Sequence, residues 1–201
     1  PIRNNINPYA ISQAMERGGA VGISILTEPT HFNGSLQTLS QVRRAVKLPL
    51  LMKDIVIVLD QIDAASNLGA NVILLIQALF DRRCTEMNVD KMISHAHNKG
   101  LEVLLETHTE GEFKAAIETE ADIVGINNRD LANLKIDLST TCRILEKYKK
   151  HDKVVISESG VKTQADIKYL RSCGAQGFLV GSSIMLTDDI EVKVKELVNT
   201  P

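Results

Sequence analysis

The sequence predicts a (β/α)8 barrel, and three observations support this fold class. Short segments rich in Val, Ile and Leu alternate with helical segments along the 201 residues, as in a parallel sheet whose two faces are both covered. Polar residues follow most of the apolar segments, whereas an open doubly wound sheet gathers them at the single point where the strand order reverses. No GxGxxG motif follows the first apolar segment. Both features favour a closed barrel over an open doubly wound sheet. Closure needs one more strand before the first helix. Only Pro1 and Ile2 stand there, so this first strand is expected to be incomplete.

A first helix is predicted within residues 3–18. Asn7 is placed as its N-cap, Pro8 lies in the first turn, and Gly18 with Gly19 ends the helix, because these residue types favour helix ends. The other predicted helices cover residues 36–46, 60–68, 85–98, 110–118, 139–149, 164–173 and 189–198.

The predicted strands are apolar along their length, and four of them end in a polar residue. Side chains at the C-terminal end of a barrel strand can project into a site built by the loops. These polar residues stand at or next to the end of an apolar run, and they are Lys53, Glu106, Asn127 and Glu158. The seven predicted strands cover residues 20–27, 50–57, 71–77, 101–106, 122–126, 153–157 and 177–180.

Composition indicates one compact domain over residues 1–201. The chain is 44% hydrophobic and has no Pro-, Gly- or Ser-rich linker, so a single core is expected. A net charge of −2 and an aromatic content of 3% argue against a nucleic-acid partner. No apolar run approaches the length that crosses a membrane, and the first residues do not resemble a signal peptide.

The three cysteines predict a reduced, cytoplasmic protein. Cys84, Cys142 and Cys173 are scattered, odd in number and without CxxC spacing. We therefore expect free thiols at helix positions, as is usual in the cytoplasm.

Lys53 and Glu106 are candidates for acid–base chemistry. Burial among apolar strands lowers the pKa of a lysine, which suits a general acid; the alternative is a lysine whose ammonium group reaches solvent. Glutamate is rarely buried without a partner, so Glu106 is either a general base or the ion-pair partner of Lys53.

The segment after the fifth predicted strand is rich in hydrogen-bonding groups. Asn127, Asn128, Arg129 and Asp130 follow one another, and the planar guanidinium of Arg129 matches a substrate carboxylate. The alternative is an ordinary turn with a surface Arg–Asp pair.

Small residues after the last two predicted strands indicate a phosphate site. Free backbone N–H groups in such loops bind phosphate, and barrels of this class often hold it there. The residues concerned are Ser159, Gly160, Gly181 and Ser182.

The histidines predict no metal site. His95 and His97 are two residues apart on one predicted helix, so they face different ways. His108 lies just beyond Glu106 and is expected to be solvated, and His31 and His151 to lie on the surface.

These motifs together resemble the indole-3-glycerol phosphate synthase family. They occur in order over the whole chain, each at a strand end. They are Ser24-Ile25-Leu26-Thr27-Glu28, Phe32-Asn33-Gly34-Ser35, Leu48-Pro49-Leu50-Leu51-Met52-Lys53-Asp54, Leu104-Leu105-Glu106, Gly125-Ile126-Asn127-Asn128-Arg129-Asp130-Leu131, Ser157-Glu158-Ser159-Gly160 and Gly181-Ser182-Ser183-Ile184-Met185.

The resemblance implies a TIM barrel that converts 1-(2-carboxyphenylamino)-1-deoxyribulose 5-phosphate to indole-3-glycerol phosphate, with loss of CO₂ and water. It implies no cofactor and no metal. By position, Lys53 is the general acid toward the ribulose carbonyl, Glu106 acts in the dehydration, and Asn127 and Glu158 orient the substrate. The binding residues implied are Arg129 near the anthranilate part, Phe32 and Leu131 as apolar walls, and Ser159, Gly160, Gly181 and Ser182 at the phosphate.

One departure from the family pattern concerns the first strand. Pro1-Ile2 resembles its start, whereas Arg3-Asn4-Asn5 resembles the chain well beyond it. Either the strand and its Glu/Lys-bearing loop belong to the molecule but not to this sequence, or the barrel lacks them. The first alternative is preferred, because losing a strand exposes two sheet edges.

Two other functions stay open at this point. A phosphoribosylanthranilate isomerase has a similar phosphate site but uses a Cys/Asp pair, and no cysteine ends a strand here. The second alternative function is that of a catalytically inactive barrel that binds the sugar phosphate. The modest loops are compatible with a monomer or a homodimer.

Overall fold

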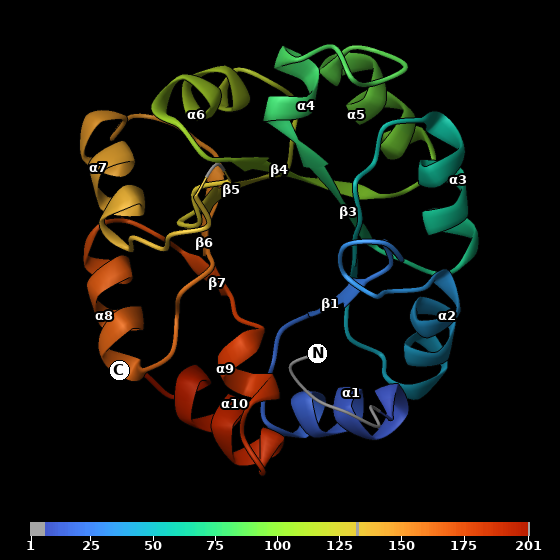
Figure 1. Cartoon of the computed structure of the whole chain (residues 1–201), viewed down its shortest axis with the longest axis vertical. Coiled ribbons are helices and arrows are strands. Elements are labelled where there is room, and N and C mark those ends of the chain that lie inside the picture. Colours follow the sequence, from blue (N-terminus) through green and yellow to red (C-terminus); the bar gives the residue numbers. More distant parts are fainter. Residues whose placement is uncertain (1–6, 132, 201) are drawn as a thin grey trace.

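The computed structural model describes residues 7–131 and 133–200. Seven parallel strands pair in chain order and curl into a barrel-like sheet (Figure 1). This confirms the α/β class and the parallel, sequential sheet that the alternation predicts. The strands are β1 (Ile23–Leu26), β2 (Leu50–Lys53), β3 (Val72–Ile76), β4 (Glu102–Thr107), β5 (Ile123–Asn127), β6 (Val154–Glu158) and β7 (Gly177–Leu179).

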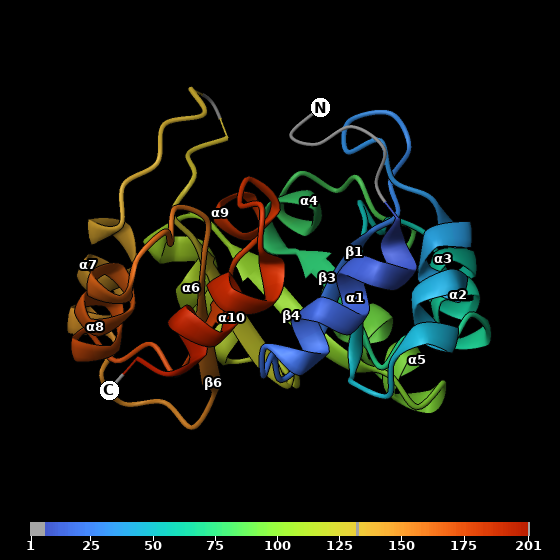
Figure 2. The same cartoon turned by 90° about the horizontal axis from the view of Figure 1, so that it is seen from below.

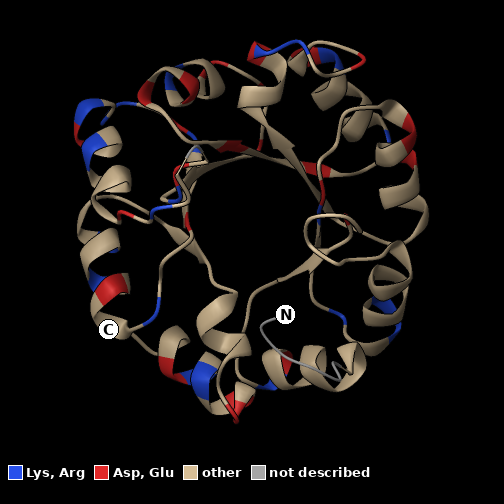
Figure 3. Cartoon of the chain, in the orientation of Figure 1, with Lys and Arg blue, Asp and Glu red and all other residues tan. Residues whose placement is uncertain are grey.

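The helices lie outside the sheet and form a ring around it (Figure 1). Charged residues are spread over these helices and the loops that join them to the strands (Figure 3). The helices are α1 (Pro8–Arg17), α2 (Leu36–Ala45), α3 (Leu59–Asn67), α4 (Gln77–Asp81), α5 (Val89–Asn98), α6 (Glu110–Ile117), α7 (Ser139–Lys147), α8 (Gln164–Ser172), α9 (Ser182–Met185) and α10 (Ile190–Val198).

Most of the longer helices have a polar N-cap residue, whose side chain accepts a hydrogen bond from a backbone N–H of the first turn. Asn7, predicted as the cap of α1, accepts from Ala10, and Pro8 occupies the first helical position. The other residues that cap in this way are Ser35, Asn88, Thr109, Thr163 and Asp189.

Strand alternation divides the core into two layers. In β2, Leu50 and Met52 face the helices and pack in the large outer core, whereas Leu51 faces the inside of the curled sheet. Leu74 of β3 and Leu104 of β4 join Leu51 in this smaller inner cluster. A strand residue two positions beyond an inner leucine therefore also faces inward.

Over the described residues, the ring of helices is closed, whereas the sheet is open between its first and last strands. Within the described part of the chain, β1 and β7 are the two edges of the sheet and do not pair with each other. Nevertheless α1 packs against α10, and Arg17 Nε donates to Glu191 Oε2 at 2.7 Å. The predicted first strand falls on Pro1-Ile2, which lie outside the described residues.

The clearest differences between the expected and the observed elements concern β2, α5 and two short helices. The strand predicted over residues 50–57 ends at Lys53, and α5 begins at Val89 rather than residue 85. Two short helices, α4 and α9, were not predicted. Helix α4 follows β3 directly, and its N-cap Ile76 provides no side-chain cap that the sequence could reveal.

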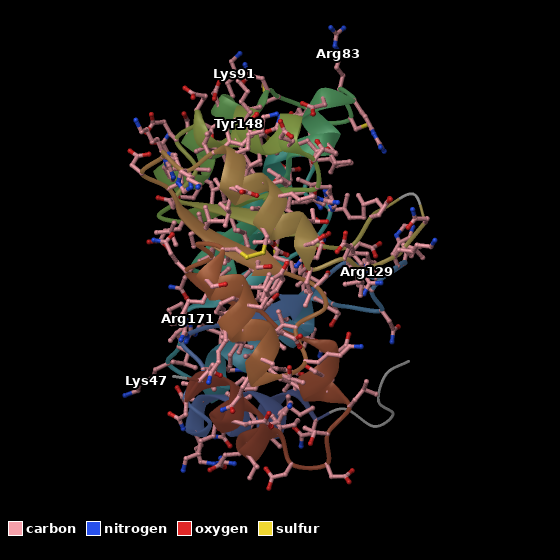
Figure 4. The ribbon with its side chains drawn as sticks, turned by 90° about the vertical axis from the view of Figure 1, so that its left-hand side faces the viewer. Lys47, Arg83, Lys91, Arg129, Tyr148 and Arg171 are labelled. Atoms are coloured by element: carbon pink, nitrogen blue, oxygen red, sulfur yellow. A yellow bond between two sulfur atoms is a disulfide. The ribbon has the colours of Figure 1, made fainter. Side chains whose placement is uncertain are left out.

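The prediction of three reduced thiols is wrong for two of them. Cys142 of α7 and Cys173 at the end of α8 form a disulfide, drawn in yellow between these neighbouring helices in Figure 4. Their separation of 31 residues is about the length of one β/α unit, so equivalent positions on adjacent helices meet. Cys84 is free and exposed in the α4–α5 connection rather than on a helix.

Reduction of this disulfide is expected to lower the free energy of unfolding by roughly 2–4 kcal/mol, because it removes a constraint on the unfolded chain. Cys142→Ser should have the same effect, and Cys84→Ser, the matched control, should have none. Urea denaturation with and without reductant measures the difference. Equal midpoints would show that the bridge does not contribute to stability.

No helix in the described part of the chain is long and apolar enough to cross a membrane.

Candidate active site

Three predicted residues meet on the inner face at the C-terminal ends of their strands. Lys53, Glu106 and Glu158 each stand two positions beyond a residue of the inner apolar cluster, namely Leu51, Leu104 and Ile156. Their side chains therefore point inward at one end of the curled sheet. The loops after β1 and β5 project from the same end of the molecule (Figure 2).

Lys53 bridges the two carboxylates. Its Nζ lies 2.8 Å from Glu106 Oε2 and 3.2 Å from Glu158 Oε2. All three side chains are largely buried, with Lys53 the most exposed at 18%. One buried ammonium group between two buried carboxyl groups leaves an unbalanced negative charge if both carboxyls ionise.

Burial and charge push the pKa values of the two carboxyls apart. Burial raises the pKa of Glu158 to about 8, and the nearby Glu106 adds to this rise against the opposing charge of Lys53. Burial also acts to raise the pKa of Glu106, but contact with His108 and the charge of Lys53 outweigh it and hold that pKa well below its usual range. At neutral pH Glu158 therefore carries a proton and Glu106 does not.

The expectation of a lowered lysine pKa is wrong. Burial acts in that direction, but the charges of Glu158 and Glu106 outweigh it and raise the pKa of Lys53. Lys53 is therefore an ammonium ion, and it donates hydrogen bonds to both carboxyl groups.

A glycine provides the space for the Glu158 carboxyl. Gly125 of β5 pairs beside β6, and a Cβ atom at this position would lie 2.2 Å from Glu158 Oε1. That oxygen is buried and has no hydrogen-bond partner among the described residues. Any larger side chain at position 125 would displace the carboxyl.

Hydrogen bonds of Asn127 and Arg129 hold the segment after β5. Asn127 Oδ1 accepts the backbone N–H of Arg129 at 3.0 Å, and Arg129 Nη1 donates to the Leu134 carbonyl at 3.3 Å. Arg129 lies on the projecting loop (Figure 4), and Leu131 is 50% exposed there. Asn127 pairs with Glu158 in the β5–β6 register and so lies beside the cluster, whereas Arg129 and Leu131 lie in the loop beyond the strand end.

Phe32 lies on the other projecting loop, after β1, and is 40% exposed. The buried carboxylate of Glu28 fixes this loop by accepting the backbone N–H groups of Thr30 and Phe32 at 2.9 and 3.1 Å. Phe32 and Leu131 are therefore partly exposed apolar residues on the two loops after β1 and β5, and these loops project from the same end of the molecule (Figure 2).

The four predicted phosphate residues lie in neighbouring loops. Ser159 and Gly160 follow β6 with positive φ angles of 63° and 93°, and Gly181 and Ser182 begin α9 after β7. The two loops are joined because Ser183 Oγ donates to the Val161 carbonyl at 2.9 Å. Gly181 and Ser182 are exposed, and the space beside Gly181 is open.

Comparison with known proteins shows a family match. The sequence profile of indole-3-glycerol phosphate synthase matches residues 1–197. The protein of that name from Haloarcula marismortui is 40% identical over 194 residues, which cover 95% of this chain and 70% of the relative. The chain belongs to the indole-3-glycerol phosphate synthase family.

Two further relatives carry the same name. The protein from Methanocaldococcus jannaschii is 42% identical over 94% of this chain and 68% of its own length. The protein from Petrotoga mobilis is 38% identical over 98% of this chain and 78% of its own.

Among solved structures, a thiamine phosphate pyrophosphorylase from Pyrococcus furiosus superposes with a TM-score of 0.71, covering 98% of this chain and 89% of that one. Its sequence identity of 18% indicates a shared fold alone.

Two buried residues beside the site were not among the predicted catalytic and binding residues. His108, expected in solvent, has a side chain only 8% exposed and touches Glu106. Asn128 is buried and donates to Ser157 Oγ and to the Glu158 carbonyl, both at 2.9 Å, which joins the ends of β5 and β6. The sequence did offer one indication of a site position for each residue, because a polar amide or imidazole group stands directly beyond an apolar strand.

His151 also departs from the prediction of a surface position. Its ring packs edge-on against Phe113, and its Nδ1 is buried. This contact lies in the outer core and away from the strand ends.

Proposed function

We propose that this member of the indole-3-glycerol phosphate synthase family closes the indole ring of 1-(2-carboxyphenylamino)-1-deoxyribulose 5-phosphate. In that reaction the aromatic carbon that bears the carboxylate attacks the ribulose carbonyl, CO₂ leaves, and loss of the resulting hydroxyl as water gives indole-3-glycerol phosphate. The observation that carries the proposal is the ammonium group of Lys53 between an ionised and a protonated carboxyl at the strand ends.

Each of these three groups has a role in the proposed reaction. Lys53 donates to the ribulose carbonyl oxygen and stabilises the negative charge that develops there. Glu158, protonated at neutral pH, can supply a proton to the departing hydroxyl. Glu106, ionised, can accept the proton lost as the ring becomes aromatic. Asn127 at the end of β5 helps to orient the substrate hydroxyls.

The remaining predicted residues would bind the two ends of the substrate. Phe32 and Leu131 offer apolar surface to the anthranilate ring, and Arg129 offers a planar guanidinium to its carboxylate. Backbone N–H groups and hydroxyls of the adjoining loops would hold the phosphate. These loop residues are Ser159, Gly160, Gly181 and Ser182.

We also propose that the complete fold is a single-domain, closed (β/α)8 barrel. The contact between α1 and α10 brings the two ends of the helix ring together, while β1 and β7 are left as the edges of the sheet among the described residues. One strand between these edges would satisfy their backbone groups. We place the protein in the cytoplasm, although disulfides are uncommon there.

The function is tested by incubating the protein with the carboxyphenylamino substrate and recording indole fluorescence. The protein should form product, and Glu106→Gln, which keeps the shape but removes the base, should lose roughly 10²–10⁴-fold in turnover. The exposed Glu118→Gln is the matched control and should behave as the unchanged protein. Substrate binding without product would instead support a binding-only barrel.

A further inference from the structure

We propose that His108 is a positioning residue of this site, which holds the Glu106 carboxylate ionised and oriented toward Lys53. The inference deepens the proposed function and rests on it. It assigns a role to a buried histidine that ring closure does not use directly.

Each carboxylate oxygen of Glu106 faces a different cation. Oε2 accepts from Lys53 at 2.8 Å, and Oε1 lies 3.2 Å from His108 Nε2. Because the two contacts engage opposite sides of the carboxylate, they fix its rotation about the last side-chain bond. With Lys53 alone, Glu106 could turn and share the proton of the nearby Glu158.

Glu112 of α6 holds His108 in place. Its Oε2 lies 3.5 Å from His108 Nδ1 and accepts the backbone N–H of His108 at 2.8 Å. The imidazole therefore stands between two carboxylates, one in the site and one on the outer helix. Glu106 and Glu112 are the charged groups that contact it among the described residues.

The charge state of His108 agrees with this geometry. Burial acts to lower its pKa, but the two carboxylates outweigh burial and raise it to about 9. Among the described residues, the other histidines do not lie between two largely buried carboxylates. His97, for example, bonds Asp122 at 2.9 Å with both side chains more than a third exposed.

The test combines turnover with a titration that needs no substrate. His108→Gln should lower kcat roughly 10–100-fold, as is usual for a partner that orients a functional group, with little change in KM. The acid limb of its pH–rate profile should move to higher pH, because Glu106 has lost one of its two cations. His97→Gln, the matched control, should leave both unchanged. A lower kcat with an unshifted profile, or an unchanged kcat, would overturn the proposal.

Glu112→Gln provides a second variant in case His108→Gln does not fold. It leaves the imidazole in place but removes its outer carboxylate, so the pKa of His108 should fall. By NMR titration of the substrate-free protein, the His108 ring should titrate well above the usual histidine value of about 6.5, and at lower pH in Glu112→Gln than in the unchanged protein. A His108 ring that titrates near the usual histidine value would contradict the inference. Absence of product from the unchanged protein would instead contradict the proposed function.

Discussion

Lys53→Ala is expected to lower turnover by roughly 10²–10⁴-fold or more, the usual cost of removing a positioned acid. The ammonium group is the donor that both Glu106 and Glu158 share, so its removal takes away the charge that would stabilise the carbonyl oxygen of the substrate. Steady-state formation of indole product at saturating substrate measures the loss.

The fold should survive this change. After truncation Glu106 still contacts His108, and Glu158 can remain protonated, so no buried carboxylate is left without a compensating group. The far-ultraviolet circular dichroism should therefore match that of the unchanged protein. Lys99→Ala is the control, because Lys99 pairs with Asp63 at 3.0 Å on the exposed surface. Equal turnover in the two variants would remove Lys53 from the mechanism.

Gly125→Ala is expected to reduce turnover by roughly 10²-fold or more with folding retained, because a misplaced catalytic group commonly has an effect of this size. The added methyl group would lie 2.2 Å from Glu158 Oε1 and 3.2 Å from a methyl carbon of Leu104. The carboxyl must move, and its contact with Lys53 is lost. Kinetics of the purified variant, with its thermal midpoint, measure both effects.

Gly111→Ala is the matched control for this substitution. Gly111 lies inside α6, and a Cβ atom there meets nothing within 4 Å. Replacement of a helical glycine by alanine stabilises by about 0.4–1 kcal/mol, so this variant should gain stability and keep its activity. Normal kinetics in Gly125→Ala would show that the position of Glu158 is not critical.

The site residues at the strand ends were predictable from the sequence because each follows a local run of apolar residues. Lys53, Glu106 and Glu158 each end an apolar segment, and a parallel sheet brings such ends to one edge. The contacts between them confirm that expectation. Their pKa values were not predictable, since the rise at Lys53 depends on two carboxylates that are 53 and 105 residues away along the chain.

The features that sequence reasoning missed depend on contacts between different elements of the fold. His108 is buried because Glu112 of the next helix accepts from it. Cys142 and Cys173 meet because α7 and α8 are neighbours in the ring. The need for glycine at position 125 follows from the β5–β6 register, which pairs Gly125 with Ile156 two residues before Glu158. Only His108 had a local indication, which was its position directly beyond an apolar strand.

The most direct test of the central claim is a double-mutant cycle on kcat/KM with Lys53→Ala, Glu106→Gln and the variant that carries both. If the two residues act as one unit, the double variant should be about as active as the weaker single variant, because removing either group already disables the other. Losses that multiply would show that Lys53 and Glu106 act independently, and that their 2.8 Å contact is a structural ion pair.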